Sequence, residues 1–196
     1  MAQDSSRPDF WDTRYRDRVM PWDTGHVPPD LRVFLKTLSP GTRILVPGCG
    51  SAHEVYYLAQ NGFDVTAIDF SVEAVEIAQR NLGCFADRVR LADFFSFDYG
   101  NSPFDVLYER AFLCALPRKM WGDYARRTAD LVRHEGCLAG FFFYADTPRG
   151  PPYGTNPEEL HALLDADFDL LEDRPASESL PVFAGGERWQ VWKRRA

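Results

Sequence analysis

A chain of 196 residues is long enough to bury the core of one domain and too short for two ordinary ones. Its net charge of −7 argues against a nucleic acid as the main partner, since binding to a phosphate backbone needs a concentrated basic surface. No apolar run approaches the ~20 residues that a membrane span needs. The polar start also lacks the apolar segment of a signal peptide. We therefore expect a cytoplasmic protein that binds neither membranes nor nucleic acid.

The cysteines give no sign of a metal site. They lie far apart in apolar surroundings, at Cys49, Cys84, Cys114 and Cys137. Paired spacings that would predict metal ligands are absent from the sequence, so we expect reduced thiols in the core of the protein and no metal.

The first thirty residues differ from a core segment because large aromatic residues stand among charges. Trp11, Tyr15 and Trp22 are spaced four and then seven apart, which could align them on one face of a helix. One interpretation is an arm that docks on the domain. The other is a lid whose rings hold a sulfonium by cation–π attraction and exclude water.

A glycine turn follows the first predicted strand. After a helix over 30–38, the apolar run Arg43–Val46 breaks at Gly48 and Gly50, and a helix is predicted over 52–60. A strand, a tight glycine turn and a helix N-terminus together form a cradle for a nucleotide-like ligand. The alternative is a plain connection between strand and helix.

The second predicted strand, over 64–68, runs into the carboxylate of Asp69. This acid lies about twenty residues past the glycines, where such folds place the acid that binds a ribose hydroxyl. A residue that merely caps the next helix is the structural alternative. In a dinucleotide fingerprint counted from Gly48, the last glycine would fall on His53, whose side chain disfavours a nicotinamide cofactor.

The later elements alternate between helix and strand. We predict helices over 72–82, from Pro117 to before Gly136, and over 158–164, and strands over 89–91, 104–108, 137–144, 168–172 and 188–192. The 137–144 run carries no charge and should be central in the sheet. This alternation predicts an α/β protein with a mostly parallel sheet and helices on both faces.

Several stretches together resemble a known family. The spacing Gly48-x-Gly50-x-Ala52 is similar to the first motif of class I S-adenosylmethionine-dependent methyltransferases, and over nearly its whole length the chain resembles the thiopurine S-methyltransferase family, including the thiol and halide methyltransferases. The matching stretches are Trp11 with Tyr15, Pro21-Trp22-Asp23-Thr24-Gly25, Val46-Pro47-Gly48-Cys49-Gly50, Ile68-Asp69-Phe70-Ser71, Asp93-Phe94, Tyr108 to Pro117, Gly150-Pro151-Pro152-Tyr153 and Glu187 to Trp192.

The resemblance implies a single Rossmann-like methyltransferase domain over residues 30–196, preceded by an aromatic arm or lid over residues 1–29. Its sheet should have seven strands with an antiparallel last strand. The implied cofactor is S-adenosylmethionine. The residues implied to hold it are Trp11, Tyr15, Trp22, Gly48, Gly50, Asp69, Phe70, Asp93, Phe94 and Arg110.

Arg110 is the residue that we expect to act on the acceptor. It follows the predicted fourth strand, where a fixed guanidinium could attract an anionic thiolate. An ion pair with Glu109 or Asp105 is the structural alternative. Further acceptor contacts are expected from Arg149, Tyr153 and His26.

The function implied by the resemblance is methyl transfer from S-adenosylmethionine to a small soft nucleophile. The acceptor that we expect first is a thiol, and the others are halide, selenium or tellurium species. The protein is expected to be a monomer. If the acceptor arrives as an anion, no proton-transferring residue is required. The two alternatives are a catalytically silent cofactor-binding module and a nicotinamide-dependent oxidoreductase, which His53 argues against.

Overall fold

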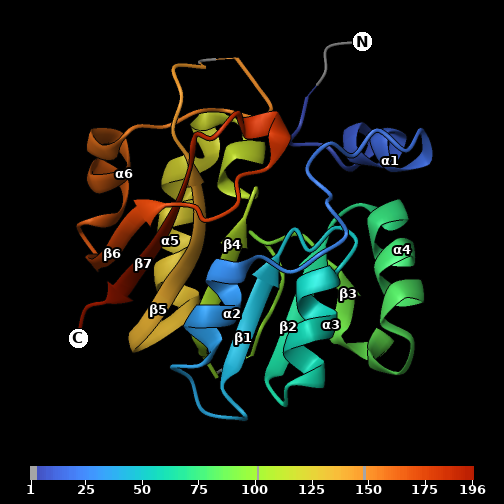
Figure 1. The fold of residues 1–196 in the computed structure, drawn as a ribbon, viewed down its shortest axis with the longest axis horizontal. Coiled ribbons are helices and arrows are strands. Elements are labelled where there is room, and N and C mark those ends of the chain that lie inside the picture. Colours follow the sequence, from blue (N-terminus) through green and yellow to red (C-terminus); the bar gives the residue numbers. More distant parts are fainter. Residues whose placement is uncertain (1–3, 101, 148) are drawn as a thin grey trace. The chain divides into compact units, whose positions relative to one another are not determined.

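The computed structural model describes residues 4–100, 102–147 and 149–196. Contacts within the chain divide it into two compact units, Met1–Phe97 and Asp98–Ala196 (Figure 1). Each unit contains strands and helices of its own. Among the described helices, none combines the length and the apolarity that crossing a lipid bilayer requires.

The first unit holds three parallel strands. Its elements are α1 (Pro8–Arg16), α2 (Pro29–Leu35), β1 (Arg43–Pro47), α3 (His53–Gln60), β2 (Asp64–Asp69), α4 (Val72–Leu82), the 3₁₀ turn η1 (Gly83–Arg88) and β3 (Val89–Leu91). β2 pairs with β1 on one side and with β3 on the other. Because all three strands run in the same direction, their carboxyl ends lie at one edge of the sheet, where ligands bind in this class of fold.

Burial explains why these segments fold as they do. Ile44 and Leu45 in β1 are at most 1% exposed, as expected for a strand covered on both faces. The helix α4 begins where Ser71 accepts a hydrogen bond from the backbone N–H of Ala74 at 3.1 Å. The predicted bounds of α4 and β3 are confirmed.

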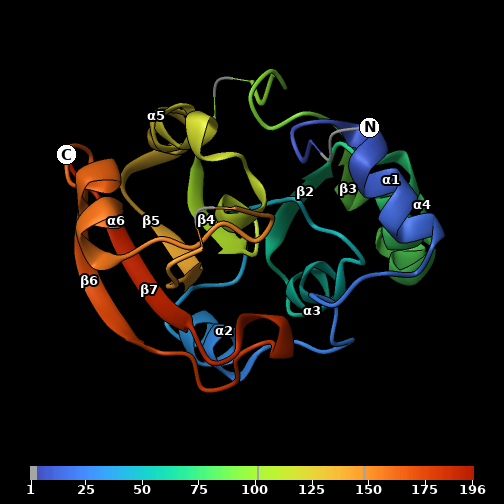
Figure 2. The ribbon, with the colours of Figure 1, turned by 90° about the horizontal axis from the view of Figure 1, so that it is seen from above.

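The second unit holds the other four strands. Its elements are β4 (Phe104–Arg110), the 3₁₀ turns η2 (Leu113–Ala115) and η3 (Arg118–Met120), α5 (Trp121–Leu131), β5 (Val132–Phe143), α6 (Pro157–Leu164), β6 (Phe168–Pro175), the 3₁₀ turn η4 (Pro181–Phe183) and β7 (Glu187–Arg194). β4 and β5 are parallel, whereas β7 runs antiparallel to both β5 and β6 (Figure 2). The core of this unit contains Trp189 and Trp192, both fully buried.

The sheet topology confirms the predicted fold class. The strand order is β3-β2-β1-β4-β5-β7-β6, and the last strand, β7, is antiparallel to its neighbours. An α/β protein with a mostly parallel seven-stranded sheet was expected, and this is the topology observed.

Several details of the sequence-based prediction were wrong. The helix predicted over 30–38 ends at Leu35. The helix expected to continue until Gly136 ends at Leu131, because β5 begins at Val132 and bends at Glu135, which has a φ of +64°. Arg110 is the last residue of β4 and does not follow it. Cys84 is exposed, since it lies in the turn η1 after α4, so it is not a thiol of the core.

Gly140 is the tightest point between β4 and β5. A Cβ atom there would lie 1.9 Å from the backbone oxygen of Glu109, and backbone cannot move aside as a flexible side chain can. We expect Gly140→Ala to lower the free energy of unfolding by about 3 kcal/mol or more, as overpacking of a core does at its upper range. Urea unfolding measures this change.

Gly122→Ala is the matched control. Gly122 lies in α5, and the nearest atom to an added Cβ is 3.8 Å away. This substitution should stabilise the protein by roughly 0.5–1 kcal/mol, because alanine favours a helix more than glycine does. Equal effects of the two substitutions would contradict the close approach at Gly140.

Candidate functional site

The turn after β1 is wound in the left-handed region of the backbone. Gly48 and Gly50 have φ values of +60° and +52°, and Ala52, the residue that precedes α3, has a φ of +62°. A Cβ atom at Gly50 would lie 2.9 Å from the hydroxyl oxygen of Tyr15, so a larger residue would displace this ring. The positive φ and the nearby hydroxyl both favour glycine at position 50.

Asp69 connects the end of β2 to this turn. Its Oδ2 atom accepts a hydrogen bond from the backbone N–H of Gly50 at 3.1 Å, and its Oδ1 atom accepts one from the N–H of Ser71 at 2.9 Å. The side chain is buried, and burial raises its pKa to about 6 even though both backbone bonds act in the opposite direction. The acid predicted to bind a ribose is thus fixed against the glycine turn.

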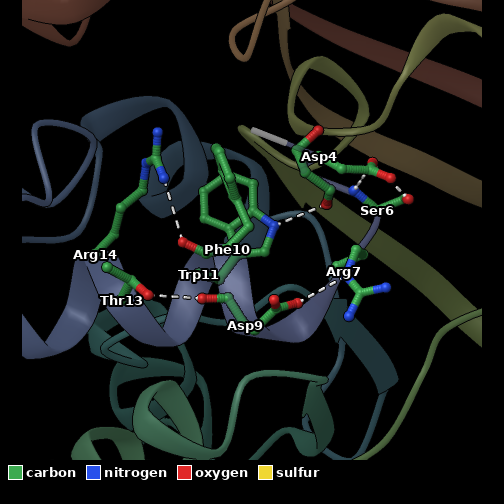
Figure 3. A network of polar contacts seen from close by, with 9 residues as sticks. Asp4, Ser6, Arg7, Asp9, Phe10, Trp11, Thr13 and Arg14 are labelled. Carbon is green, nitrogen blue, oxygen red and sulfur yellow. Dashed lines mark hydrogen bonds and ion pairs between the residues drawn. The ribbon is translucent and has the colours of Figure 1, made fainter. Parts of the chain in front are cut away.

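The aromatic residues of the N-terminal arm gather into one cluster. Ring centroids of Trp11 and Trp22 are 5.4 Å apart, and those of Tyr15 and Trp22 are 6.1 Å apart, both in edge-to-face arrangements. The indole N–H of Trp11 donates to the backbone oxygen of Ser5 at 2.9 Å (Figure 3), which fixes the orientation of this ring. The three rings do lie together, but not on one helical face: Trp11 and Tyr15 lie in α1, whereas Trp22 lies in a turn after this helix.

Two aspartates attach the arm to the rest of the first unit. Asp12 in α1 accepts a 2.6 Å hydrogen bond from the hydroxyl of Ser71 at the start of α4. Asp23 accepts a hydrogen bond from the hydroxyl of Ser51 in the glycine turn, and its Oδ1 atom lies 3.0 Å from Nε2 of His53. Sequence reasoning missed both attachments, because nothing in the sequence pairs residues so far apart.

The Asp23–His53 contact changes the pKa values of both partners. The hydrogen bond from His53 lowers the pKa of Asp23 well below its usual range, and the same bond raises the pKa of His53. His53 stands where a dinucleotide fingerprint would have its last glycine. Its side chain here has a role in holding the arm.

Three further residues expected to hold the cofactor lie after β2 and β3. Asp93 is exposed, and its Oδ1 atom accepts a hydrogen bond from the N–H of Phe95 at 2.8 Å. Phe94 is buried against Phe95, with ring centroids 5.2 Å apart, and Phe70 is half-buried. Their contacts with a cofactor stay a prediction.

The second unit contains a narrow pocket near the end of β4, with no room for a water molecule in this conformation. It is lined by Glu109, Leu113, Cys114, Trp121, Phe141, Phe142, Phe143, Tyr153 and Thr155. Of the residues predicted to contact the acceptor, Tyr153 is among these, and its backbone N–H donates to the oxygen of Cys114 at 2.7 Å. Arg149 and His26 are both exposed, and Nδ1 of His26 lies 3.2 Å from the backbone oxygen of Thr24.

Arg110 and Glu109 are adjacent in β4, and neighbouring side chains of a strand point to opposite faces. The guanidinium of Arg110 lies 5.2 Å from the ring centroid of Phe141, in cation–π geometry. The alternative partner Asp105 forms an ion pair with Arg133 at 2.6 Å. Phe141 lines the pocket, so Arg110 contacts the wall of the pocket through this ring.

Glu109 is a candidate that sequence reasoning missed. It is 1% exposed, and its Oε1 atom accepts hydrogen bonds from the backbone N–H groups of Phe112 at 2.8 Å and Leu113 at 3.1 Å. Burial raises its pKa to about 7. The available signal was a carboxylate in the second-to-last position of a buried strand, which is costly without a partner or a function.

The fold and this arrangement define the class. A glycine turn after β1 and a buried acid at the end of β2 are typical of class I methyltransferases. A solved structure of the 1,6-didemethyltoxoflavin-N1-methyltransferase of Burkholderia thailandensis, with S-adenosylhomocysteine bound, covers 96% of this chain and 87% of its own at 21% identity and a TM-score of 0.76. Magnesium protoporphyrin IX methyltransferase of Synechocystis, with bound SAM, has a TM-score of 0.71 at 17% identity and covers 96% of this chain and 95% of its own.

The sequence then gives the family. The family model described as Thiopurine S-methyltransferase matches residues 6–195, so the chain belongs to that family. The thiopurine S-methyltransferase of Azotobacter vinelandii is 30% identical, over 83% of this chain and 84% of that protein. Thiocyanate methyltransferase 1 of Arabidopsis thaliana is 26% identical, over 94% and 84% respectively.

Asp69 should make cofactor binding depend on pH. Because its pKa is raised to about 6, the carboxylate that can accept hydrogen bonds from ribose is present above that pH and lost below it. Affinity for S-adenosylhomocysteine should therefore fall as the pH drops through 6. Asp69→Asn should weaken binding by roughly 1–3 kcal/mol and abolish this dependence. Calorimetric titration at several pH values measures both effects. Normal binding by the variant would mean that Asp69 is only a structural cap.

The Asp23–His53 pair should hold the arm in a defined pH window. The lowered pKa of Asp23 keeps its charge down to acidic pH, and the raised pKa of His53 means that its charge is complete below ~6.5 and lost as the pH rises through the raised value. His53→Ala should speed tryptic cleavage at Arg14 and Arg16 about fivefold at pH 6, for an ion pair worth about 1 kcal/mol.

The difference between His53→Ala and the wild-type protein should shrink above the raised pKa of His53. His161→Ala serves as the control, because the 2.9 Å contact of His161 with Asp165 joins residues only four apart at the C-terminal end of α6, away from the arm in the sequence. If both variants are cleaved alike at pH 6, His53 does not hold the arm.

Proposed function

We propose that this protein transfers the methyl group of S-adenosylmethionine to a small soft nucleophile, foremost a thiol. The observation that carries the proposal is the contact of Asp69 and Tyr15 with Gly50 in a chain of the thiopurine S-methyltransferase family. A buried acid, a glycine without space for a side chain and an aromatic arm meet at one turn. These are the features that a nucleoside with a sulfonium group needs.

The residues present fit this cofactor. The carboxylate of Asp69 can accept hydrogen bonds from ribose hydroxyls, the turn offers backbone N–H groups close to the ligand, and the arm offers electron-rich ring faces to a cation. The proposed cofactor residues are Trp11, Tyr15, Trp22, Gly48, Gly50, Asp69, Phe70, Asp93, Phe94 and Arg110. When bound, S-adenosylmethionine supplies a methyl group on a positively charged sulfur.

What the chain itself contributes is alignment and exclusion of water. Positioning of two reactants can account for up to roughly 7–11 kcal/mol of barrier reduction. The arm of residues 1–29 is proposed as the lid that excludes water from the cofactor site of the domain over 30–196. Arg110 is proposed to stabilise an anionic acceptor by its permanent charge. Arg149, Tyr153 and His26 are proposed as further acceptor contacts.

The acceptor class follows from the family and from the relatives. Thiocyanate and thiopurine methyltransferases among the relatives are named for sulfur acceptors, one an anion and one a heteroaromatic compound. We propose a small thiol for this chain, with halide, selenium or tellurium species as related acceptors. We also propose that the protein acts as a monomer in the cytoplasm. Its net charge of −7 disfavours a nucleic acid as its partner.

A screen with S-adenosylmethionine tests the proposal. The full chain is incubated with thiols, iodide, tellurite and selenite, and methylated product is measured. We expect product from at least one thiol. Binding of S-adenosylhomocysteine without any methyl transfer would support a catalytically silent module, and binding of NADH in its place would support an oxidoreductase.

Arg110→Met should slow transfer to anionic acceptors about tenfold or more, as expected if a charge that contributes roughly 1.5–3 kcal/mol is removed from the acceptor. Because Arg110 is also proposed to contact the cofactor, the affinity of this variant for S-adenosylhomocysteine is measured separately. Arg133→Met is the control, because Arg133 pairs with Asp105 at the start of β4. The ratio of kcat/KM values for iodide decides it. Equal rates for the two variants would remove Arg110 from the acceptor site.

A further inference from the structure

The helix α4 is hydrogen-bonded to the site near both of its ends. At its start, the backbone N–H of Ser71 donates to Oδ1 of Asp69 at 2.9 Å. In its last turn, Nδ2 of Asn81 donates to the backbone oxygen of Ser51 at 2.9 Å. Because α4 packs beside α3 in the first unit (Figure 1), this second bond joins the end of one helix to the turn that leads into the other.

The peptide group between Ser51 and Ala52 is held at both of its polar atoms. Its oxygen accepts the hydrogen bond from Asn81, and its N–H donates to the backbone oxygen of Cys49 at 2.9 Å. Since a peptide group is planar, two hydrogen bonds on its opposite sides fix the orientation of the whole plane. Ser51 is only 8% exposed, so water has limited access to replace the bond from Asn81.

This peptide plane sets the backbone conformation of Ala52. The φ angle of Ala52 is +62°, and it measures the rotation between that plane and the Cα atom of Ala52. A residue other than glycine is strained in this left-handed region, and such a conformation persists only where its surroundings enforce it. The hydrogen bonds of the Ser51–Ala52 peptide provide that enforcement at the point where the chain enters α3.

The same turn carries the groups that are proposed to receive the cofactor. The N–H of Gly50 donates to Asp69, and the hydroxyl of Ser51 donates to Asp23 of the arm. Without the bond from Asn81, the Ser51 carbonyl would be free to rotate, and the neighbouring N–H groups of the turn would rotate with it. The side chain of Asn81 therefore controls the shape of the turn from the end of α4.

We propose that Asn81 is a positioning residue for the cofactor. Its amide holds the Ser51–Ala52 peptide, so the glycine turn has its binding shape before the ligand arrives. A turn that is already ordered costs less to order on binding, and this raises the affinity. The inference rests on the proposed function and deepens it, because it adds to the cofactor site a residue that acts on the ligand only through the turn.

Asn81→Ala in the full chain tests the proposal. Asn81 is exposed, so the substitution opens no cavity in the core. We expect the affinity for S-adenosylhomocysteine, measured by calorimetric titration, to fall about fivefold, as the loss of one hydrogen bond predicts. An unchanged affinity would overturn the proposal.

Asn61→Ala is the matched control. Asn61 is also exposed, and its Nδ2 atom donates to the backbone oxygen of Tyr57, four residues earlier in the chain, at 2.7 Å. This variant therefore loses the same kind of hydrogen bond at the end of α3, away from the glycine turn. Urea unfolding should show similar losses of stability for Asn61→Ala and Asn81→Ala, and only Asn81→Ala should lose affinity. Equal losses of affinity would show a general effect of destabilisation and overturn the proposal.

Asn81→Asp separates the hydrogen bond from the shape of the side chain. Aspartate has nearly the same size, but its carboxylate has no proton to donate to the Ser51 oxygen and repels it. The affinity should fall at least as far as in Asn81→Ala. Wild-type affinity in Asn81→Asp would mean that the hydrogen bond is not needed, which would overturn the proposal.

Ala52→Gly tests whether Asn81 acts through the backbone of the turn. Glycine adopts a positive φ without strain, so the turn depends less on enforcement by its neighbours. With glycine at position 52, the further change Asn81→Ala should lower the affinity less than about twofold, because the binding conformation stays well populated. A loss that stays fivefold would show that Asn81 does not act through Ala52 and would overturn the proposal.

Hydrogen exchange of the ligand-free protein gives a readout independent of binding. The N–H of Ala52 should exchange about fivefold faster in Asn81→Ala than in the wild-type protein, and Asn61→Ala should leave it unchanged. An unchanged rate in Asn81→Ala would overturn the proposal. Failure of the wild-type protein to bind S-adenosylhomocysteine would overturn the proposed function and this inference with it. Normal binding by both wild-type protein and Asn81→Ala would overturn this inference alone.

Discussion

The carboxylate of Asp69 is the interaction on which the first unit depends. It stands at the end of β2 and accepts hydrogen bonds from Gly50, in the turn after β1, and from Ser71, at the start of α4. Two strand ends and a helix N-terminus are thereby held at one point. Burial of the acid raises its pKa to about 6, which means that its charged form is destabilised. Acids with such raised pKa values cluster at functional sites.

The arm builds on this same point. Tyr15 lies against Gly50, while Asp12 and Asp23 bind the hydroxyls of Ser71 and Ser51 on either side of it. These attachments of the arm therefore end on residues close to Asp69 or in the glycine turn. We expect a ligand bound at the turn to alter the surroundings of the arm, which is the physical reason for the lid that we propose.

The sequence predicted those features that depend on local patterns. The bounds of α4 and β3, the glycine turn and the antiparallel β7 were expected from periodicity, from glycine positions and from the family resemblance. The pairing of Asp23 with His53 was not, because it joins side chains thirty residues apart and depends on how the arm folds back. The burial of Glu109 beside a pocket was also not predicted. Alternation along a strand shows which face a side chain points to, but it does not show whether a pocket lies on that face. Contact of the acceptor with Arg110, Arg149 and His26 remains a prediction.

The central claim is that the arm and the glycine turn form one cofactor site, and hydrogen exchange of the full chain tests it most directly. Backbone amides are followed with and without S-adenosylhomocysteine. We expect the ligand to slow exchange in α1 and around Trp22 together with the turn from Gly48 to Ser51. Slower exchange confined to the turn and to β2, with the arm unchanged, would contradict it.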